Sequence, residues 1–138
     1  MAETLAEVMT LLAAGTNPDP GFKDGTVRCF VEEVTYASQA DGDTIQIAKL
    51  PKGAIPMFGM LVADTSSGSA TIAIGVSGTA GKYRAAAVFT ATNTPTLFGV
   101  ESGLCEALSA EETVIITVGT AALPSSGTLR VMFFYAFD

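Results

Sequence analysis

The 138-residue chain contains no histidine and no tryptophan. Without histidine, Ser-His-Asp and Cys-His catalysis are excluded, together with the commonest metal ligand and the side chain that titrates nearest to neutral pH. The lack of tryptophan weakens the case for a sugar-stacking platform. We therefore expect neither a catalytic site nor a cofactor or metal, and we look for function in surface contacts.

Charge is scarce as well. Charged residues make up 15% of the chain and hydrophobic residues 49%, whereas about a quarter of an average domain is charged. The net charge of −7 disfavours nucleic-acid binding, which needs clustered Lys and Arg to release phosphate counterions. No apolar run reaches the roughly 18 residues of a membrane span, and the first residues lack a signal-peptide pattern. We expect synthesis in the cytoplasm and no membrane partner.

The two cysteines, Cys29 and Cys105, are far apart in sequence and lie inside apolar segments without CxxC spacing. This placement predicts two buried, reduced thiols, although a disulfide between them stays open.

In the first residues of the chain, the spacing of apolar side chains differs from the spacing in the rest. Apolar side chains at helical spacing, acids in the early turns and Gly15 predict a short α-helix over about residues 3–14. A connector with two prolines and two glycines follows, over residues 16–25. We therefore divide the chain into an N-terminal helical arm with its connector, residues 1–25, and a β-sandwich domain, residues 26–138. The arm's apolar stripe requires a partner, either the sandwich or another protein.

From residue 26 onward, short apolar runs alternate with turn residues, which predicts an all-β fold. In the last run, Leu129 and Phe133 belong to one face, while Met132 and Phe134 belong to the other. Both faces are apolar, so this run is either a central strand or a subunit contact. About eight strands are the number found in a jelly-roll sandwich, and they are expected at residues 27–36, 44–50, 57–64, 70–76, 83–89, 96–100, 113–118 and 129–137.

Three motifs resemble functional sites without matching them. Asp64-Thr65-Ser66 ends an apolar run as in aspartic proteases, but Ser66 stands where that family has glycine. Residues 75–82 resemble a phosphate-binding loop, but the spacing of their glycines does not match that motif. A glycine-rich hairpin is the better interpretation. Asp41-Gly42-Asp43 offers too few oxygen ligands for calcium and is expected to form a turn.

Four segments together resemble small virion structural proteins of tailed bacteriophages. These segments are Asp41–Pro56, with its Leu-Pro-Lys-Gly turn, Gly59–Asp64, Ile72–Val76 and Gly127–Val131. The resemblance covers roughly residues 26–138 and leaves the arm outside.

The resemblance implies a capsid decoration or cement protein on the capsid surface, a non-enzymatic β-sandwich that reinforces the shell, commonly as a trimer. Its implied partners are the major capsid protein and further copies of itself. A receptor- or glycan-binding head-fibre or tail module is the alternative, and an aspartic-protease-like enzyme the second alternative. The side chains proposed for capsid or partner contact are Leu5, Val8, Met9, Leu12, Phe22, Met132 and Phe134.

Overall fold

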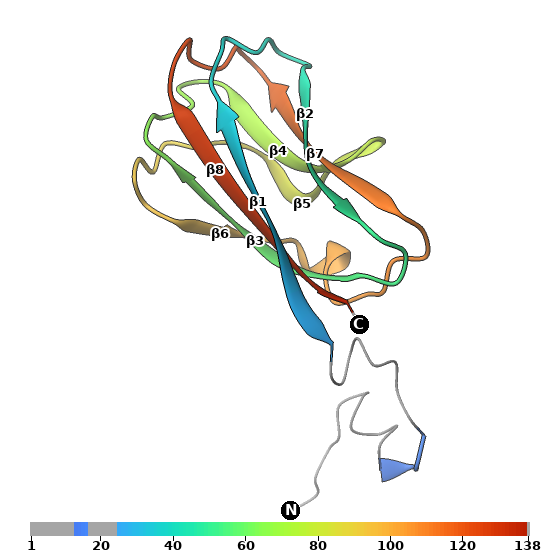
Figure 1. Cartoon of the computed structure of the whole chain (residues 1–138). Helices are drawn as coiled ribbons and strands as arrows, with labels where there is room; N and C mark the ends of the chain where they lie inside the picture. The colour runs from blue at the N-terminus through green and yellow to red at the C-terminus, as the bar shows by residue number, and fades with distance from the viewer. Residues whose placement is uncertain (1–12, 17–24, 138) are drawn as a thin grey trace, which may run out of the picture.

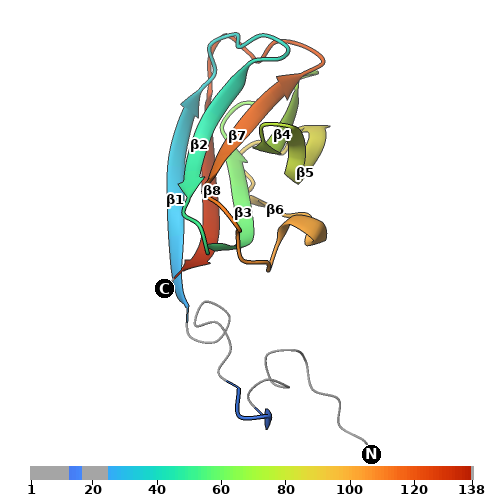
Figure 2. The same ribbon diagram turned by 90° about the vertical axis from the view of Figure 1, so that its right-hand side faces the viewer.

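The computed structural model describes residues 13–16 and 25–137. Residues 25–137 form two antiparallel four-stranded sheets that pack face to face as a β-sandwich (Figure 1). The strand order is β1-β8-β3-β6 in one sheet and β2-β7-β4-β5 in the other. Figure 2 shows the two layers from the side. The described part of the chain holds no helix long and apolar enough to cross a membrane.

All eight predicted strands are present, with ends shifted by a few residues. Residues 83–89, whose Ala-rich sequence also suits a helix, lie mostly in a strand because Tyr83 packs into the core. The strands are β1 (Thr26–Thr35), β2 (Thr44–Leu50), β3 (Ile55–Ala63), β4 (Thr71–Val76), β5 (Thr79–Val88), β6 (Thr96–Phe98), β7 (Glu112–Gly119) and β8 (Thr128–Phe137), and a 3-10 turn lies at Glu101–Gly103.

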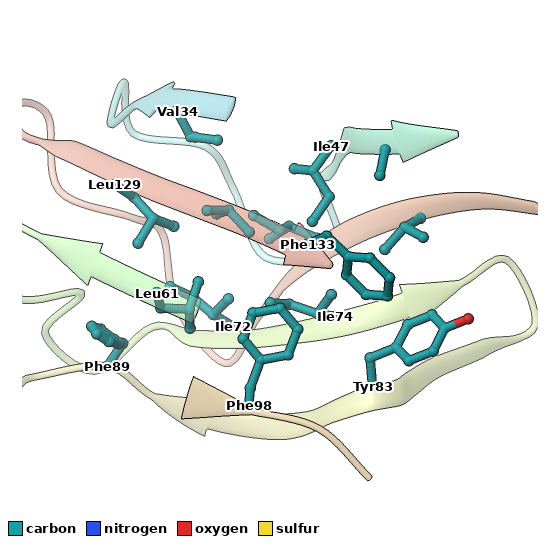
Figure 3. Packing of buried hydrophobic residues seen from close by; sticks show 14 of the residues in the cluster. Val34, Ile47, Leu61, Ile72, Ile74, Tyr83, Phe89, Phe98, Leu129 and Phe133 are labelled. Atoms are coloured by element: carbon teal, nitrogen blue, oxygen red, sulfur yellow. The ribbon is translucent and has the colours of Figure 1, made fainter. Parts of the chain in front are cut away.

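The core lies between the sheets because alternate side chains of each central strand point inward. In β7 and β8 the inward set is almost fully buried, and Phe133 packs edge-on against Tyr83 with ring centroids 4.9 Å apart (Figure 3). Gly59 lies directly under the Phe98 ring, where the absence of a Cβ lets the ring approach the backbone of β3. The inward set of β7 and β8 comprises Val114, Ile116, Val118, Leu129, Val131, Phe133 and Tyr135.

Two of the predicted turns have the expected form. Residues 75–82 make a tight hairpin in which Val76 pairs with Thr79, and Gly78 takes a φ of 89°. Gly42 has a φ of 93°, and the Asp43 amide donates to the Ala40 carbonyl at 3.0 Å. Both glycines adopt the left-handed conformation that side chains with a Cβ disfavour.

The prediction of buried cysteines is wrong. Cys29 and Cys105 are both exposed, and both are free thiols. Cys29 lies in β1, an edge strand, where it alternates outward; Cys105 follows the 3-10 turn in a loop and has a φ of 63°. Within an apolar run, alternate side chains point to opposite faces of the strand, so an apolar sequence neighbourhood does not by itself bury a residue.

The predicted α-helix over about residues 3–14 lies almost wholly outside the described residues, which include only Ala13 and Ala14 of it. The same holds for Leu5, Val8, Met9, Leu12 and Phe22.

Candidate functional site: an exposed apolar sheet face

The outward side of the β1-β8-β3-β6 sheet carries a row of apolar side chains. Val31 pairs with Met132, Met132 pairs with Met60, and Met60 pairs with Leu97, so the four residues lie side by side across all four strands. Val31 is 68% exposed and Leu97 is 65% exposed, while the two methionines are half-buried between them. We call these four residues the outer row.

A second apolar row runs beside the first. Cys29 pairs with Phe134, which pairs with Phe58, and the two phenylalanine rings stack at 4.8 Å between centroids. Both rings are half-buried, and Cys29 is exposed. The stack fills the surface between β8 and β3, so the two rows form one continuous apolar area.

Charged side chains bound this area on one side. Glu33 and Arg130 occupy the next register position along the sheet, and their Oε2 and Nε atoms are 3.3 Å apart. Both side chains are more than half exposed, so the pair contributes little to stability. An apolar centre beside a polar, solvated rim is the arrangement found at protein–protein contacts.

The distribution of exposed hydrophobic residues marks this face. Among the described residues, four large hydrophobic side chains are exposed, and three of them, Val27, Val31 and Leu97, alternate outward on this sheet. The fourth, Val88, lies at the end of β5 in the other sheet. Single exposed hydrophobic residues need no explanation, but a contiguous group indicates a binding surface.

The structure places two of the predicted contact residues here. Met132 and Phe134 lie on the outward side of β8, which is a central strand with β1 and β3 as its neighbours. Val31, Met60 and Leu97 were not predicted as contact residues from the sequence. Period-two alternation assigns each to one side of its own strand, but only the register between strands brings them into one row.

Asp64 lies outside this face, directly after β3, and forms hydrogen bonds to Thr128 at the start of β8. Its Oδ1 accepts the Thr128 amide at 2.8 Å and the Thr65 hydroxyl at 2.9 Å, and its own amide donates to the Thr128 carbonyl at 3.1 Å. The bond from the Thr128 amide is the main reason why the pKa of Asp64 is lowered. In a protease dyad two carboxylates share a proton, whereas the groups that shift the pKa of Asp64 are hydrogen-bond donors and Arg130.

A second polar cluster joins β5 to β7. The Tyr83 hydroxyl donates to one carboxylate oxygen of Glu112, and the Lys82 Nζ lies 2.5 Å from the other. Burial, and then the bond to Glu112, raise the pKa of Tyr83. The cluster satisfies a buried hydroxyl beside Phe133. Among the described residues, no group of three or more Cys, Asp or Glu side chains could hold a metal ion.

The fold is similar to that of chains in several solved capsid structures. A chain in the capsid asymmetric unit of cyanophage Pam1 superposes with a TM-score of 0.68 and 24% identity, over 83% of this chain and 86% of that one. The chain shares its fold with bacteriophage capsid proteins. No family model matches it, and no curated protein matches it.

Two further solved structures have this capsid-protein fold. A chain in the capsid of Ralstonia phage GP4 matches with a TM-score of 0.62 and 21% identity, over 84% of this chain and 86% of that one. A chain in the acid-stable capsid of Helicobacter pylori bacteriophage KHP30 matches with a TM-score of 0.61 and 12% identity, over 81% and 88%. Because the covered shares are nearly equal, the matched capsid chains are about as long as this one.

Proposed function

We propose that this chain is a non-enzymatic structural protein of a phage virion, a decoration or cement protein that binds the outside of the capsid and stabilises it. The observation that carries the proposal is the exposed outer row of Val31, Met132, Met60 and Leu97. The capsid origin of the three structural neighbours supports it. So does the similar length of the matched chains, because the likeness then involves a whole small component of those capsids.

The strand order also supports a jelly-roll assignment. Two four-stranded antiparallel sheets, ordered β1-β8-β3-β6 and β2-β7-β4-β5, interleave strands from both halves of the chain. Such interleaving of eight strands is what two Greek keys produce in a jelly roll. Connections between the sheets are then made at the two ends of the sandwich, which leaves the outward sheet faces free for contact.

The proposed partners are the major capsid protein and further copies of this chain, assembled as a trimer. In a trimer, each copy presents two different surfaces to its neighbours. Met132 and Phe134 lie on the outward sheet face, while Leu5, Val8, Met9, Leu12 and Phe22 belong to the N-terminal segment. We propose the sheet face and this segment as the contact regions.

Leu97→Asp tests the sheet face directly. A carboxylate in the outer row has to be desolvated on contact, so we expect the variant to lose most of its binding to purified capsids that lack this protein, measured by co-sedimentation. Val88→Asp is the matched control, because Val88 is also an exposed hydrophobic residue but lies in the other sheet. Equal binding by both variants and the unmodified protein would exclude the outer row as the contact surface.

A further inference from the structure

Among the described residues, no strand pairs with the edge of β1 that faces away from β8, and this free edge differs from the three other strand edges of the sandwich. β6 has only three residues and follows Pro95, β2 carries a register irregularity between Gln46 and Ala48, and β5 carries two irregularities along β4. Short strands, prolines and bulges are the usual means by which sheet edges avoid pairing with another chain. β1 has ten residues, pairs with β8 without any irregularity and contains no proline.

The hydrogen-bonding groups on this edge can be assigned from alternation. The Tyr36 amide, just beyond β1, donates to Gly127 at 2.8 Å on the β8 side. Antiparallel partners alternate in direction along a strand, so the odd-numbered residues direct their amides and carbonyls away from β8. The Thr35 carbonyl is consistent with this assignment, because it accepts a hydrogen bond from Gln39 Nε2 at 2.9 Å. Val27, Cys29, Val31 and Glu33 therefore present the free backbone groups of the edge.

A groove lies on the inner side of β1. A groove of about 220 Å³ separates β1 from β2, with Phe30 and Glu32 on one side and Ile47, Ala48 and Lys49 among the residues on the other. Phe30 and Glu32 alternate with the residues that present the free backbone groups, so the groove lies on the inner side of this edge.

We infer that β1 pairs with β1 of a second copy in antiparallel orientation about a twofold axis at Phe30. In this register Arg28 lies opposite Glu32 of the partner subunit, and the same pair recurs on the other side of the axis. Cys29 lies opposite the partner subunit's Val31. Directly opposed side chains share a sheet face, so opposite charges stabilise the pairing. Shifting the register by two residues removes these charge pairs, and shifting it by four places two like charges opposite each other.

The alternation of backbone groups fits the same register. Val27 pairs with Glu33 of the partner subunit and Cys29 with the partner's Val31, and all of these residues direct their backbone groups to the free edge. This contact deepens the self-association in the proposed function and rests on it. Strand pairing about a twofold axis joins subunits two by two, in addition to the contacts within the proposed trimer.

Disulfide trapping tests the register in the full chain. Cys105 is exposed, so Cys105→Ser provides the background. Adding Val31→Cys places a thiol opposite Cys29 of the partner subunit, at the separation of about 5.5 Å between Cα atoms that a hydrogen-bonded pair has and a disulfide accepts. In a glutathione buffer we expect most chains to become covalent dimers. Peptide mapping after digestion should show a disulfide that joins residue 29 of one copy to residue 31 of the other. The matched control, Val27→Cys in the same background, puts the new thiol opposite Glu33 and should remain monomeric on a denaturing gel.

Charge exchange provides the second measurement. Arg28→Glu or Glu32→Arg, added to the trapping variant, puts like charges opposite each other and should reduce dimer yield; both changes together should restore it. Equal trapping of the two cysteine variants, a bridge within one chain, or no recovery in the double exchange would overturn the pairing. Capsid co-sedimentation of the unmodified protein is independent of trapping, so failure of the edge contact is distinguishable from failure of the proposed function.

Discussion

The packing of the core at Gly59 leaves no room for a side chain. A methyl group at this position would overlap the ring of Phe98, which is 7% exposed and lies 6.2 Å from Phe133 between ring centroids. The ring cannot move away without displacing a second buried ring. The contact between β3 and β6, and hence the placement of Leu97 at the end of the outer row, depends on this glycine.

We therefore expect Gly59→Ala to lower the free energy of unfolding by about 1–3 kcal/mol, the usual cost of overpacking a core. Denaturant titration followed by circular dichroism measures it. Gly81→Ala is the comparison without ring overlap: its new methyl would lie 3.3 Å from Ala85 Cα, a tight contact but a much smaller overlap, so we expect a smaller loss. Adding Phe98→Leu to Gly59→Ala should recover part of the loss if ring overlap is the cause. Equal stability of Gly59→Ala and the unmodified protein would contradict this packing.

At the scale of elements, the cluster of Tyr83, Lys82 and Glu112 joins an edge strand to a central one. Burial first, and the bond to Glu112 second, raise the pKa of Tyr83 above its ordinary value of 10.0, and burial also raises the pKa of Tyr36. A raised pKa in the folded state means that the unfolded chain loses its proton first. The stabilising contribution is complete below pH 10 and declines as the pH rises above it.

We expect the free energy of unfolding to decrease as the pH rises from about 10, the ordinary tyrosine pKa, to about 11.5. The slope should be shallower in Tyr83→Phe and shallower still when Tyr36→Phe is added, because each change removes one linked proton. Urea titrations at several pH values measure these slopes. Identical slopes in all three proteins would show that the alkaline transition has another origin.

The strands themselves could be predicted from the sequence because period-two alternation is a local property. Residues 44–50, for example, were predicted with the same bounds that β2 has. The order of strands within the sheets could not be predicted, because it depends on pairing between segments far apart in the chain. For this reason Met132 and Phe134 could be assigned to one side of their strand, whereas their neighbours Met60 and Leu97 could not be identified. Cys29 was wrongly predicted as buried because its side chain alternates to the outward face of β1.

At the scale of the whole molecule, the division into an arm, residues 1–25, and a sandwich domain, residues 26–138, stays a prediction. Among the described residues, the buried hydrophobic core lies within residues 34–136, and Phe30 and Phe137 pack against it. We therefore expect deletion of residues 1–15 to leave a folded domain with a cooperative thermal transition, and to abolish capsid binding because the arm's apolar stripe is lost.

Calorimetry and capsid co-sedimentation measure the two outcomes separately. Retained capsid binding by the shortened chain would exclude the arm as a contact, and loss of the cooperative transition would contradict the domain division. Comparison with Leu97→Asp then shows whether the arm and the sheet face contribute independently, in which case the two losses of binding free energy add.

The pairing of β1 with β8 also has a mechanical consequence. β1 begins and β8 ends at the same end of the sandwich, since Thr26 pairs with Phe137, and the ten paired positions continue without interruption to Thr35 and Thr128 (Figure 1). A pull on the N-terminal end of β1, directed away from the sandwich, acts along this ladder and perpendicular to its hydrogen bonds. The load is then shared by the whole ladder in shear, so a tether attached before Thr26 can carry tension without peeling the sheet apart bond by bond.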